Sequence, residues 1–394
     1  MMLTWKDLSI SVPLGRDILK NVSGFARSGE CLAIMGGSGS GKSTLLNALS
    51  NRINKKTGLQ MKGEIELNKQ ALTPEHRYIT GFVAQRDLFF EDLTVGETLD
   101  FVSQLKPQRT ENNTDTVTEL LEELKLTKTR NSYVGGKFRV GLSGGEKRRL
   151  SVGAELLTQP KLLLLDEPTS GLDSYTGFVI INKLKRLAKK HNIIIIFTLH
   201  QPSYEIYELC ENLMFLNHGK VTYLGKREAL QDYLHSINHP CPKKKLPADF
   251  LLDLAIKGGN EIEEVFEEGY TNRLLPDIKN IIKQAPSEHI PLETPSVGIF
   301  KQFWILLKRS FTNYIRNRVS IKLRLIQVIV SSIICNLLYY QIPSVSHKNP
   351  SSITDRLGIH FYLTSTINQL FYASNLLVCN LTSSLRKTDL YERV

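Results

Sequence analysis

Short apolar runs alternate with segments of helical periodicity over the first two thirds of the chain. Four strands are predicted, at 29–35, 78–83, 161–165 and 192–199, with helices between them, for example at 114–126 and 176–190. The last two strands are almost entirely apolar, which is typical of central strands in a sheet covered on both faces. This alternation of strands and helices predicts an α/β fold built on a parallel sheet.

The pattern changes after residue 257. Residues 258–297 are polar, with an acidic run and several prolines, and they predict a linker or a short solvated helix. From 298 to 320, apolar residues recur at helical spacing among lysines and arginines. This segment is predicted to be an amphipathic helix at a membrane interface, with Trp304 and Tyr314 as anchors.

Two long runs without Asp, Glu, Lys or Arg follow, at 325–342 and 357–385. They predict membrane spans at about 321–342 and 357–381. At ~1.5 Å per residue, each run is long enough to cross a hydrocarbon core of roughly 30 Å. A buried pair of soluble helices is the alternative. The predicted organisation is a nucleotide-binding domain at 1–257, a linker at 258–297, an interfacial helix at 298–320 and a partial transmembrane domain at 321–394.

A net charge of +11 raises the possibility of a nucleic-acid partner. Seven basic residues, however, lie between 301 and 324, where there is no acidic residue, directly before the uncharged run that begins at 325. Basic residues beside a span mark the cytoplasmic side of a membrane and suit anionic headgroups. We therefore predict an integral, multi-pass membrane protein whose first domain lies in the cytosol, with no nucleic-acid partner. Its five cysteines form no CxxC pair, so zinc binding has no support.

A glycine-rich loop follows the first of the four strands and opens a helix at 45–49. In such a loop the backbone N–H groups converge on phosphates, which a Cβ would obstruct. Lys42 is predicted to reach the β- and γ-phosphates, and the Ser43 hydroxyl to bind Mg²⁺. A plain glycine turn is the alternative. The predicted phosphate-binding residues are Gly36, Gly37, Ser38, Gly39, Ser40, Gly41, Lys42, Ser43 and Thr44.

Polar residues also follow the other three strands. Asp166 and Glu167 come directly after the strand 161–165, where Asp166 is placed to hold Mg²⁺ and Glu167 to accept a proton from water. Gln85 is placed to contact both Mg²⁺ and the water. His200 is placed to sense the γ-phosphate or to position the water, although a lone histidine is more often structural.

Ser143, Gly144 and Gly145 open a helix that is predicted to run to about residue 157. They provide a second anion-binding helix start, over 100 residues after the first. This arrangement suggests that ATP is held from two sides. The alternative is an ordinary helix cap followed by a basic helix face.

Together these segments resemble the ATP-binding cassette (ABC) family. They resemble its Walker A loop (36–44), Q-loop (Gln85), signature motif (142–146), Walker B motif (162–167), D-loop (170–173) and switch histidine (His200). Within that family the segments 93–99, 166–174, 200–203 and 247–250 resemble the G subfamily of White-type half-transporters. The resemblance implies a P-loop NTPase domain with a helical signature subdomain, followed by an α-helical transmembrane region.

The resemblance also implies a mechanism. ATP and Mg²⁺ are the expected cofactors, and the partner is a second half-transporter chain, the same or different. Each ATP would lie between Lys42 of one chain and Ser143 of the other, with Asp173 also at the nucleotide. Gln85, Glu167 and His200 would be catalytic, and Ser43, Gln85 and Asp166 would bind Mg²⁺. Hydrolysis would drive export of a small hydrophobic or amphipathic substrate across a bilayer, namely a lipid, sterol, pigment precursor or xenobiotic.

The chain departs from the family pattern at three points. Ile10 occupies the place of the aromatic residue that usually stacks on adenine, with Trp5 nearby, and Leu246 stands where the subfamily usually has Asn. Only about two spans are predicted, fewer than such half-transporters have, so the chain is expected to be truncated. The alternative function is therefore a truncated subunit that binds or hydrolyses ATP but is regulatory or transport-incompetent. A soluble ABC ATPase acting on ribosomes or DNA, or a GTPase or kinase, fits the sequence less well.

Overall fold

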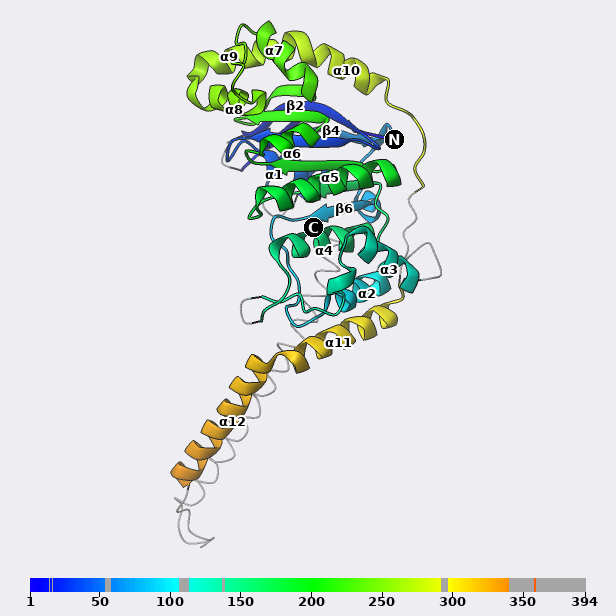
Figure 1. The fold of residues 1–394 in the computed structure, drawn as a ribbon, viewed down its shortest axis with the longest axis vertical. Coiled ribbons are helices and arrows are strands. Elements are labelled where there is room, and N and C mark those ends of the chain that lie inside the picture. The colour runs from blue at the N-terminus through cyan, green and yellow to red at the C-terminus, as the bar shows by residue number, and fades with distance from the viewer. Residues whose placement is uncertain are drawn as a thin grey trace.

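A computed structural model describes residues 1–339 and 358, except 14, 16, 54–57, 106–112, 137–138 and 292–296. Two sheets form the body of the protein (Figure 1). The larger has the order β10(Lys220–Lys226), β9(Asn212–Asn217), β3(Cys31–Gly36), β8(Ile194–Leu199), β7(Leu162–Leu165), β6(Thr80–Val83). The smaller has the order β2(Asp17–Arg27), β1(Met2–Ser11), β4(Gln60–Leu67), β5(Gln70–Ala71). Strands β9, β3, β8, β7 and β6 are parallel, which confirms the predicted α/β sheet.

The central strands are buried on both faces because successive side chains enter different cores. In β7, Leu163 and Leu165 face one core, whereas Leu162 and Leu164 face the other. The first core is closed by α5(Ser174–His191), α6(Tyr204–Leu209), α7(Leu230–Ser236) and α8(Pro247–Lys257). The second is closed by α1(Lys42–Leu49) and the smaller sheet.

A separate helical subdomain contains α2(Val95–Leu105), α3(Asn113–Glu123) and α4(Gly144–Leu156). It has its own hydrophobic cluster, which includes Leu99, Leu121 and Leu150. In Figure 1 it lies on the far side of β6 from α5. Helix α4 starts with Ser143 as its N-cap: the Ser143 Oγ accepts from the Glu146 amide, and the Glu146 carboxylate accepts from the Ser143 amide.

The predicted linker differs from what the structure contains. Residues 259–283 form α9(Gly259–Gly269), a π-helical turn (Tyr270–Leu274) and α10(Leu275–Lys283). Phe266 and Ile278 are buried, and the Tyr270 hydroxyl donates to the Ser23 carbonyl at 3.1 Å. The glutamates of this segment obscured an apolar stripe at helical spacing, which packs on the two sheets.

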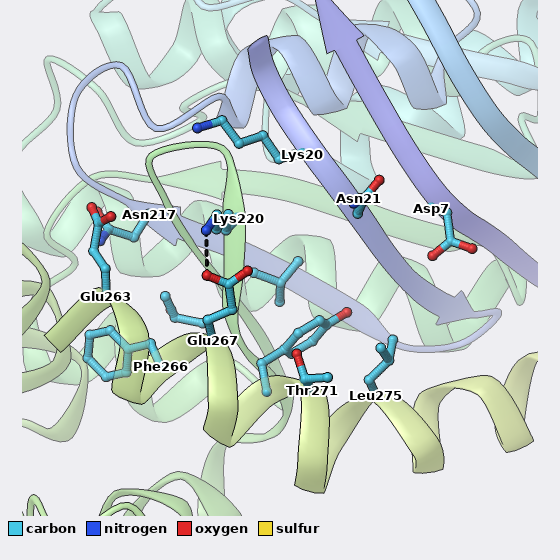
Figure 2. A pocket seen from close by; sticks show the side chains of 13 residues that line it. Asp7, Lys20, Asn21, Asn217, Lys220, Glu263, Phe266, Glu267, Thr271 and Leu275 are labelled. Atoms are coloured by element: carbon cyan, nitrogen blue, oxygen red, sulfur yellow. Dashed lines mark hydrogen bonds and ion pairs between the residues drawn. The ribbon is translucent and has the colours of Figure 1, made fainter. Parts of the chain in front are cut away.

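A cavity of about 370 Å³ lies between these helices and the strands β1, β2 and β10 (Figure 2). The Lys220 ammonium and the Glu267 carboxylate form an ion pair within it at 2.5 Å. None of the predicted site residues lines this cavity. It marks the contact between α9 and the sheets rather than the candidate site.

The predicted interfacial segment forms α11(Ile299–Arg316), and a break at Asn317 separates it from α12(Arg318–Tyr339). In Figure 1 these helices extend away from the body, beyond α2 and α3. Phe300 and Trp304 of α11 are 85% and 66% exposed. Across the described part of the chain, no helix has both the length and the apolar character needed to cross a membrane. The first predicted span overlaps α12, and the second lies outside the described residues apart from residue 358.

Candidate nucleotide-binding site

Four of the predicted site segments meet at one edge of the larger sheet. Strands β3, β8, β7 and β6 are neighbours and run in the same direction, so their carboxyl ends share an edge. The glycine-rich loop follows β3, Asp166 and Glu167 follow β7, and Gln85 follows β6 by one residue. His200 follows β8 directly and is exposed, and β8 lies beside β7 as the sequence predicts.

The loop between β3 and α1 requires glycine for steric and conformational reasons. A Cβ on Gly36 would lie 2.3 Å from the Leu216 carbonyl oxygen and 2.6 Å from the Ser40 Oγ. Gly41, the residue before α1, has φ of +99°, and a Cβ there would lie 2.6 Å from the Leu19 side chain. These two glycines are therefore required by close packing against the protein's own atoms. A Cβ on Gly37 or Gly39 would meet nothing within 4 Å, so the loop is open at these two residues, as an anion cradle requires.

Lys42 folds back over this loop. Its Nζ donates to the carbonyl oxygens of Gly36 and Gly37, each at 2.8 Å, and its side chain is almost wholly buried. Burial lowers the pKa of Lys42, and the negative charges of Glu167 and Asp166 partly offset that shift. An ammonium group has three N–H donors, so one remains for an anion at the loop.

The Asp166 carboxylate is held by two hydroxyl groups. Ser43 donates to the Asp166 Oδ1 at 3.1 Å, and Thr198 donates to the same oxygen at 2.7 Å. Two ligands at right angles around Mg²⁺, each ~2.1 Å from the ion, lie about 3.0 Å apart. The separation between Ser43 and Asp166 therefore suits a shared magnesium ion.

No group of three or more His, Cys, Asp or Glu side chains among the described residues is arranged to hold a metal. Of the predicted Mg²⁺ ligands at this edge, the Ser43 hydroxyl and the Asp166 carboxylate lie together, whereas the Gln85 amide is bonded to Glu167. Mg²⁺ is commonly bound by one or two carboxylates together with water and phosphate oxygens of a nucleotide. The donors thus suit a nucleotide-bound magnesium better than a metal cage made by the protein alone.

Glu167 and Gln85 are in direct contact. The Gln85 Nε2 donates to the Glu167 Oε2 at 2.6 Å. The backbone of Glu167 has φ of +45°, which is uncommon for a residue with a Cβ. Its amide donates to the Thr198 Oγ1 at 2.7 Å, so Thr198 contacts both Asp166 and Glu167. Sequence analysis missed Thr198, although it is the single polar residue of β8.

The remaining predicted residues lie apart from this group. Ser143 and Asp173 are exposed N-cap residues of α4 and α5, and Thr176 donates its amide to the Asp173 carboxylate. That hydrogen-bonded pair lowers the pKa of Asp173. Neither Ser143 nor Asp173 is hydrogen-bonded to the glycine-rich loop in the described part of the chain. Gly144 and Gly145 open α4 beside Ser143.

Ile10 and Trp5 do not provide a surface for adenine. Both side chains are fully buried between the smaller sheet and α1. The Trp5 ring packs against Gly24, where a Cβ would lie 2.5 Å from it. The resemblance-based position for adenine stacking is therefore occupied by core residues.

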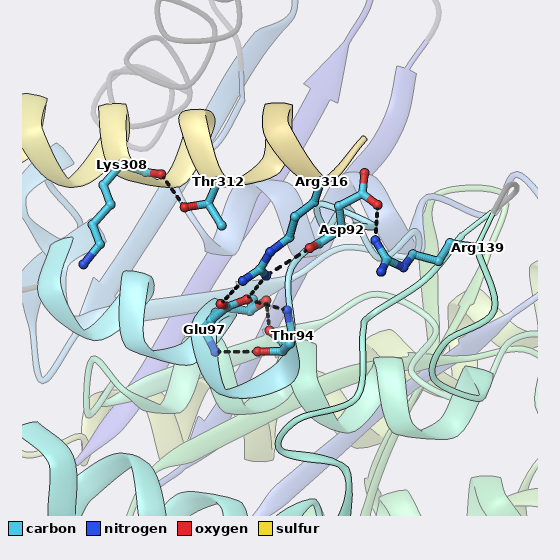
Figure 3. A network of polar contacts seen from close by, with 8 residues as sticks. Asp92, Thr94, Glu97, Arg139, Lys308, Thr312 and Arg316 are labelled. Atoms are coloured by element: carbon cyan, nitrogen blue, oxygen red, sulfur yellow. Dashed lines mark hydrogen bonds and ion pairs between the residues drawn. The ribbon is translucent and has the colours of Figure 1, made fainter. Parts of the chain in front are cut away.

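The helical subdomain makes a polar contact with α11 (Figure 3). Arg316 donates to both carboxylate oxygens of Glu97, at 2.6 and 2.8 Å, and this pairing lowers the pKa of Glu97. Arg139, which lies between the first part of the subdomain and α4, pairs with Asp92 at 2.6 Å and stacks on the Tyr133 ring. Leu93, Phe101 and Ile305 form a small apolar cluster at the same junction. Sequence analysis did not predict this junction.

Known protein families match most of the chain. The family described as "ABC transporter" matches residues 19–170, and two families described as "ABC-2 type transporter" match residues 200–283 and 301–386. The first match contains the glycine-rich loop, Gln85, Ser143, Asp166 and Glu167. The match at 301–386 begins in α11 and continues beyond the described residues.

Individual relatives agree with these matches. "Protein white" of Drosophila melanogaster is 34% identical over 94% of this chain and 56% of its own length. "ABC transporter G family member 25" of Arabidopsis thaliana is 34% identical over 89% of this chain and 55% of its own length. "ABC transporter G family member 4" of Dictyostelium discoideum is 34% identical over 91% of this chain and 45% of its own length. The chain spans about half the length of the curated relatives it matches.

Proposed function

The chain belongs to the ABC transporter family, alongside members of its G family, and from this premise we propose that it uses ATP hydrolysis to drive transport across a membrane. The observation that carries the proposal is the cluster at the sheet edge. Ser43 and Asp166 oxygens lie 3.1 Å apart, beside the buried Lys42 and the paired Glu167 and Gln85.

ATP with Mg²⁺ is the cofactor of this domain type. The loop, which is open at Gly37 and Gly39, and the paired oxygens of Ser43 and Asp166 fit that cofactor. When bound, the magnesium ion neutralises phosphate charge and fixes the phosphate chain. In our proposal the loop amides and the free N–H of Lys42 bind phosphate oxygens, while Ser43 and Asp166 hold the ion.

The catalytic roles follow from Glu167, the carboxylate that does not bind the magnesium ion in this proposal. Glu167 accepts the proton of the attacking water, since Asp166 is engaged by two hydroxyl donors. Gln85 donates to Glu167 and orients its carboxylate, and it leaves that bond to contact the ion or the water. His200 positions the water or the terminal phosphate from the neighbouring strand.

The functional unit in this proposal is a head-to-tail dimer with a second half-transporter chain. Ser143 and Asp173 would contact the nucleotide of the partner, because both are exposed helix caps that do not contact the loop of their own chain. A helix start with free amides favours an anion. Each ATP would then join two chains, and its hydrolysis would separate them.

We further propose that α11 transmits this movement to the membrane part. Arg316 ties α11 to α2 through Glu97, and Arg139 ties the segment before α4 to Asp92 (Figure 3). The exposed apolar face of α11 suits a membrane interface, and the region 301–386 matches a membrane-domain family. The substrate expected from the resemblance is small and hydrophobic or amphipathic, and export is the expected direction.

Replacing Glu167 tests the proposal most directly. In the purified full chain, Glu167→Gln should lower ATP hydrolysis by about 10²–10⁴-fold while MgATP still binds, because only the proton acceptor is lost. Glu64→Gln, an exposed position on β4, is the matched control and should hydrolyse ATP like the wild type. Hydrolysis at the wild-type rate by Glu167→Gln would show that another group is the base.

A further inference from the structure

Arg148 is a buried arginine that the proposed mechanism does not use. It lies on the second turn of α4, and its side chain is 4% exposed. One terminal nitrogen donates to the Ala84 carbonyl at 2.5 Å and contacts the Asp87 carboxylate at 3.2 Å. The other donates to the Asp166 carbonyl at 2.6 Å. One guanidinium therefore joins α4 to the ends of both β6 and β7.

The two carbonyl groups directly precede two residues of the candidate site. The Ala84 carbonyl belongs to the peptide unit that leads into Gln85, and the Asp166 carbonyl to the unit that leads into Glu167. These are the two residues whose side chains meet at 2.6 Å. Arg148 thus fixes the backbone from which each of the paired side chains departs.

The peptide unit between Asp166 and Glu167 is held at both of its polar atoms. Arg148 binds its carbonyl oxygen at 2.6 Å, and Thr198 binds its N–H at 2.7 Å. Both side chains are buried. The unit precedes the left-handed backbone of Glu167, and such a conformation persists only where the surroundings impose it.

We propose that Arg148 is a positioning residue that sets the orientation of Glu167 and Gln85 and links them mechanically to the start of α4. The inference rests on the proposed ATPase function for its kinetic consequence, though not for its structural one. Since α4 begins at Ser143, any movement of that helix on contact with a partner's nucleotide would reach the carboxylate of this chain through Arg148. Lysine could not replace it fully, because a guanidinium reaches two carbonyls in a fixed fork.

Asp87 completes the arrangement and sets the choice of variants. Its carboxylate accepts from Arg148 and, at 2.5 Å, from the Ser151 hydroxyl on the next turn of α4. Removing Arg148 alone would leave this carboxylate without its cation, which can itself impair folding. The double variant Arg148→Met/Asp87→Asn removes both charges. A defect in this variant therefore comes from the lost contacts of Arg148 with the two carbonyls and not from an unpaired Asp87 carboxylate.

The experiment compares four variants of the full chain: Arg148→Met, Arg148→Lys, the double variant, and Arg186→Met as a control at an exposed arginine of α5. Two quantities are measured. One is hydrogen–deuterium exchange of the Asp166 and Glu167 amides in the nucleotide-free chain. The other is the split between kcat and KM for ATP.

We expect Arg148→Met and the double variant to exchange the two amides about tenfold faster than the wild type. Their kcat should fall about 10–100-fold, the usual effect of losing an outer-shell partner, with a much smaller change in KM. Arg148→Lys should recover part of both losses, and Arg186→Met should match the wild type.

Wild-type exchange at both amides in the folded double variant would overturn the proposal, as would faster exchange with unchanged kcat. A fall in kcat without faster exchange would also overturn it, because the effect would then arise elsewhere. If the wild-type chain itself hydrolysed no ATP, the proposed function would fail, while the exchange measurement would still decide whether Arg148 holds the strand ends.

Discussion

The edge of the sheet and the junction between α2 and α11 are held together in different ways. At the edge, the loop is shaped by its own glycines, and Lys42 binds the carbonyls of its own loop. At the junction, Arg316 and Glu97 are 219 positions apart, and each side chain is about a third exposed. The first is organised around the buried side chains of Lys42 and Thr198, although Ser43 and Gln85 are themselves exposed. The second depends on two long side chains that are both in partial contact with water.

This difference matches what each region must do in the proposed cycle. A site that binds phosphate and orients a proton acceptor gains from groups that do not have to rearrange. A contact that transmits movement must be able to break and re-form, which a half-exposed ion pair does at little cost. We therefore expect substitutions at the edge to change chemistry strongly, and substitutions at the junction to change stability and coupling more modestly.

After Glu167→Gln, Lys42→Met should have the largest effect. Loss of the ammonium removes the cation that binds phosphate in the proposed site, so hydrolysis should fall by about 10²–10³-fold. Phosphate-release kinetics and equilibrium binding of MgATP to the purified chain measure this. Lys62→Met, at an exposed position of β4, controls for loss of a lysine charge. Tight MgATP binding by Lys42→Met would remove that residue from the site.

The same variant can test the proposed dimer. Ser143→Arg should also be inactive, because a bulky cation would block the face meant for the partner's nucleotide. In a mixture of Lys42→Met and Ser143→Arg chains, a mixed pair retains one intact composite site. Hydrolysis should therefore reappear on mixing. If the mixture remains as inactive as either variant alone, the two residues do not share a site across chains.

Ile305→Ala should come next in size. Ile305 is 7% exposed and contacts Leu93 and Phe101 in the small cluster between α11 and α2. Truncating a buried isoleucine costs about 2–5 kcal/mol, and we expect the lower end because this cluster is small. Hydrogen–deuterium exchange along α11 should rise, while the Lys42 loop should be unaffected.

Ile299→Ala is the matched control for this change. Ile299 belongs to the same helix but is 82% exposed, so its truncation should leave α11 attached. Equal exchange in the two variants would mean that the apolar cluster does not hold the helix in place.

The sequence predicts the edge of the sheet better than the junction, because the edge is built from short contiguous segments. The phosphate loop, Asp166 and Glu167 lie in short contiguous segments whose glycines and strand ends have a recognisable pattern, and adjacent parallel strands bring them to one edge. Thr198 and Arg148 could not be predicted in this way, because their importance depends on which backbone atoms they reach after folding.

The α9–α10 region and the junction were missed for related reasons. Residues 261–268 are mostly glutamates, so their composition predicts a solvated segment. The apolar stripe that includes Phe266 and Tyr270, both buried in the structure, was therefore missed. The contact between Arg316 and Glu97 joins two helices that the sequence places in separate domains. A pairing of this kind has no local signal, since an arginine among seven basic residues resembles its neighbours.

The Arg316–Glu97 pair should give the smallest effect. In a double-mutant cycle with Arg316→Met and Glu97→Gln, the coupling free energy of unfolding should be about 0.5–1 kcal/mol, since the pair is partly exposed to solvent. Denaturant unfolding of the single and double variants at neutral pH measures it. A coupling free energy of zero would show that the contact between Arg316 and Glu97 does not stabilise the folded chain.

The coupling should also depend on pH, with a sign fixed by the pKa of Glu97. The hydrogen bonds from Arg316 lower that pKa from its ordinary value of 4.5 in the folded state. The unfolded chain therefore binds a proton before the folded chain does, so the stabilisation is complete above the ordinary pKa and is lost as pH falls through the folded value. Arg316 stays protonated throughout this range and adds no pH dependence of its own. The difference in free energy of unfolding between the wild type and Arg316→Met should therefore shrink on acidification. A difference that persists in acid would show that Arg316 stabilises the junction by packing rather than through the Glu97 carboxylate.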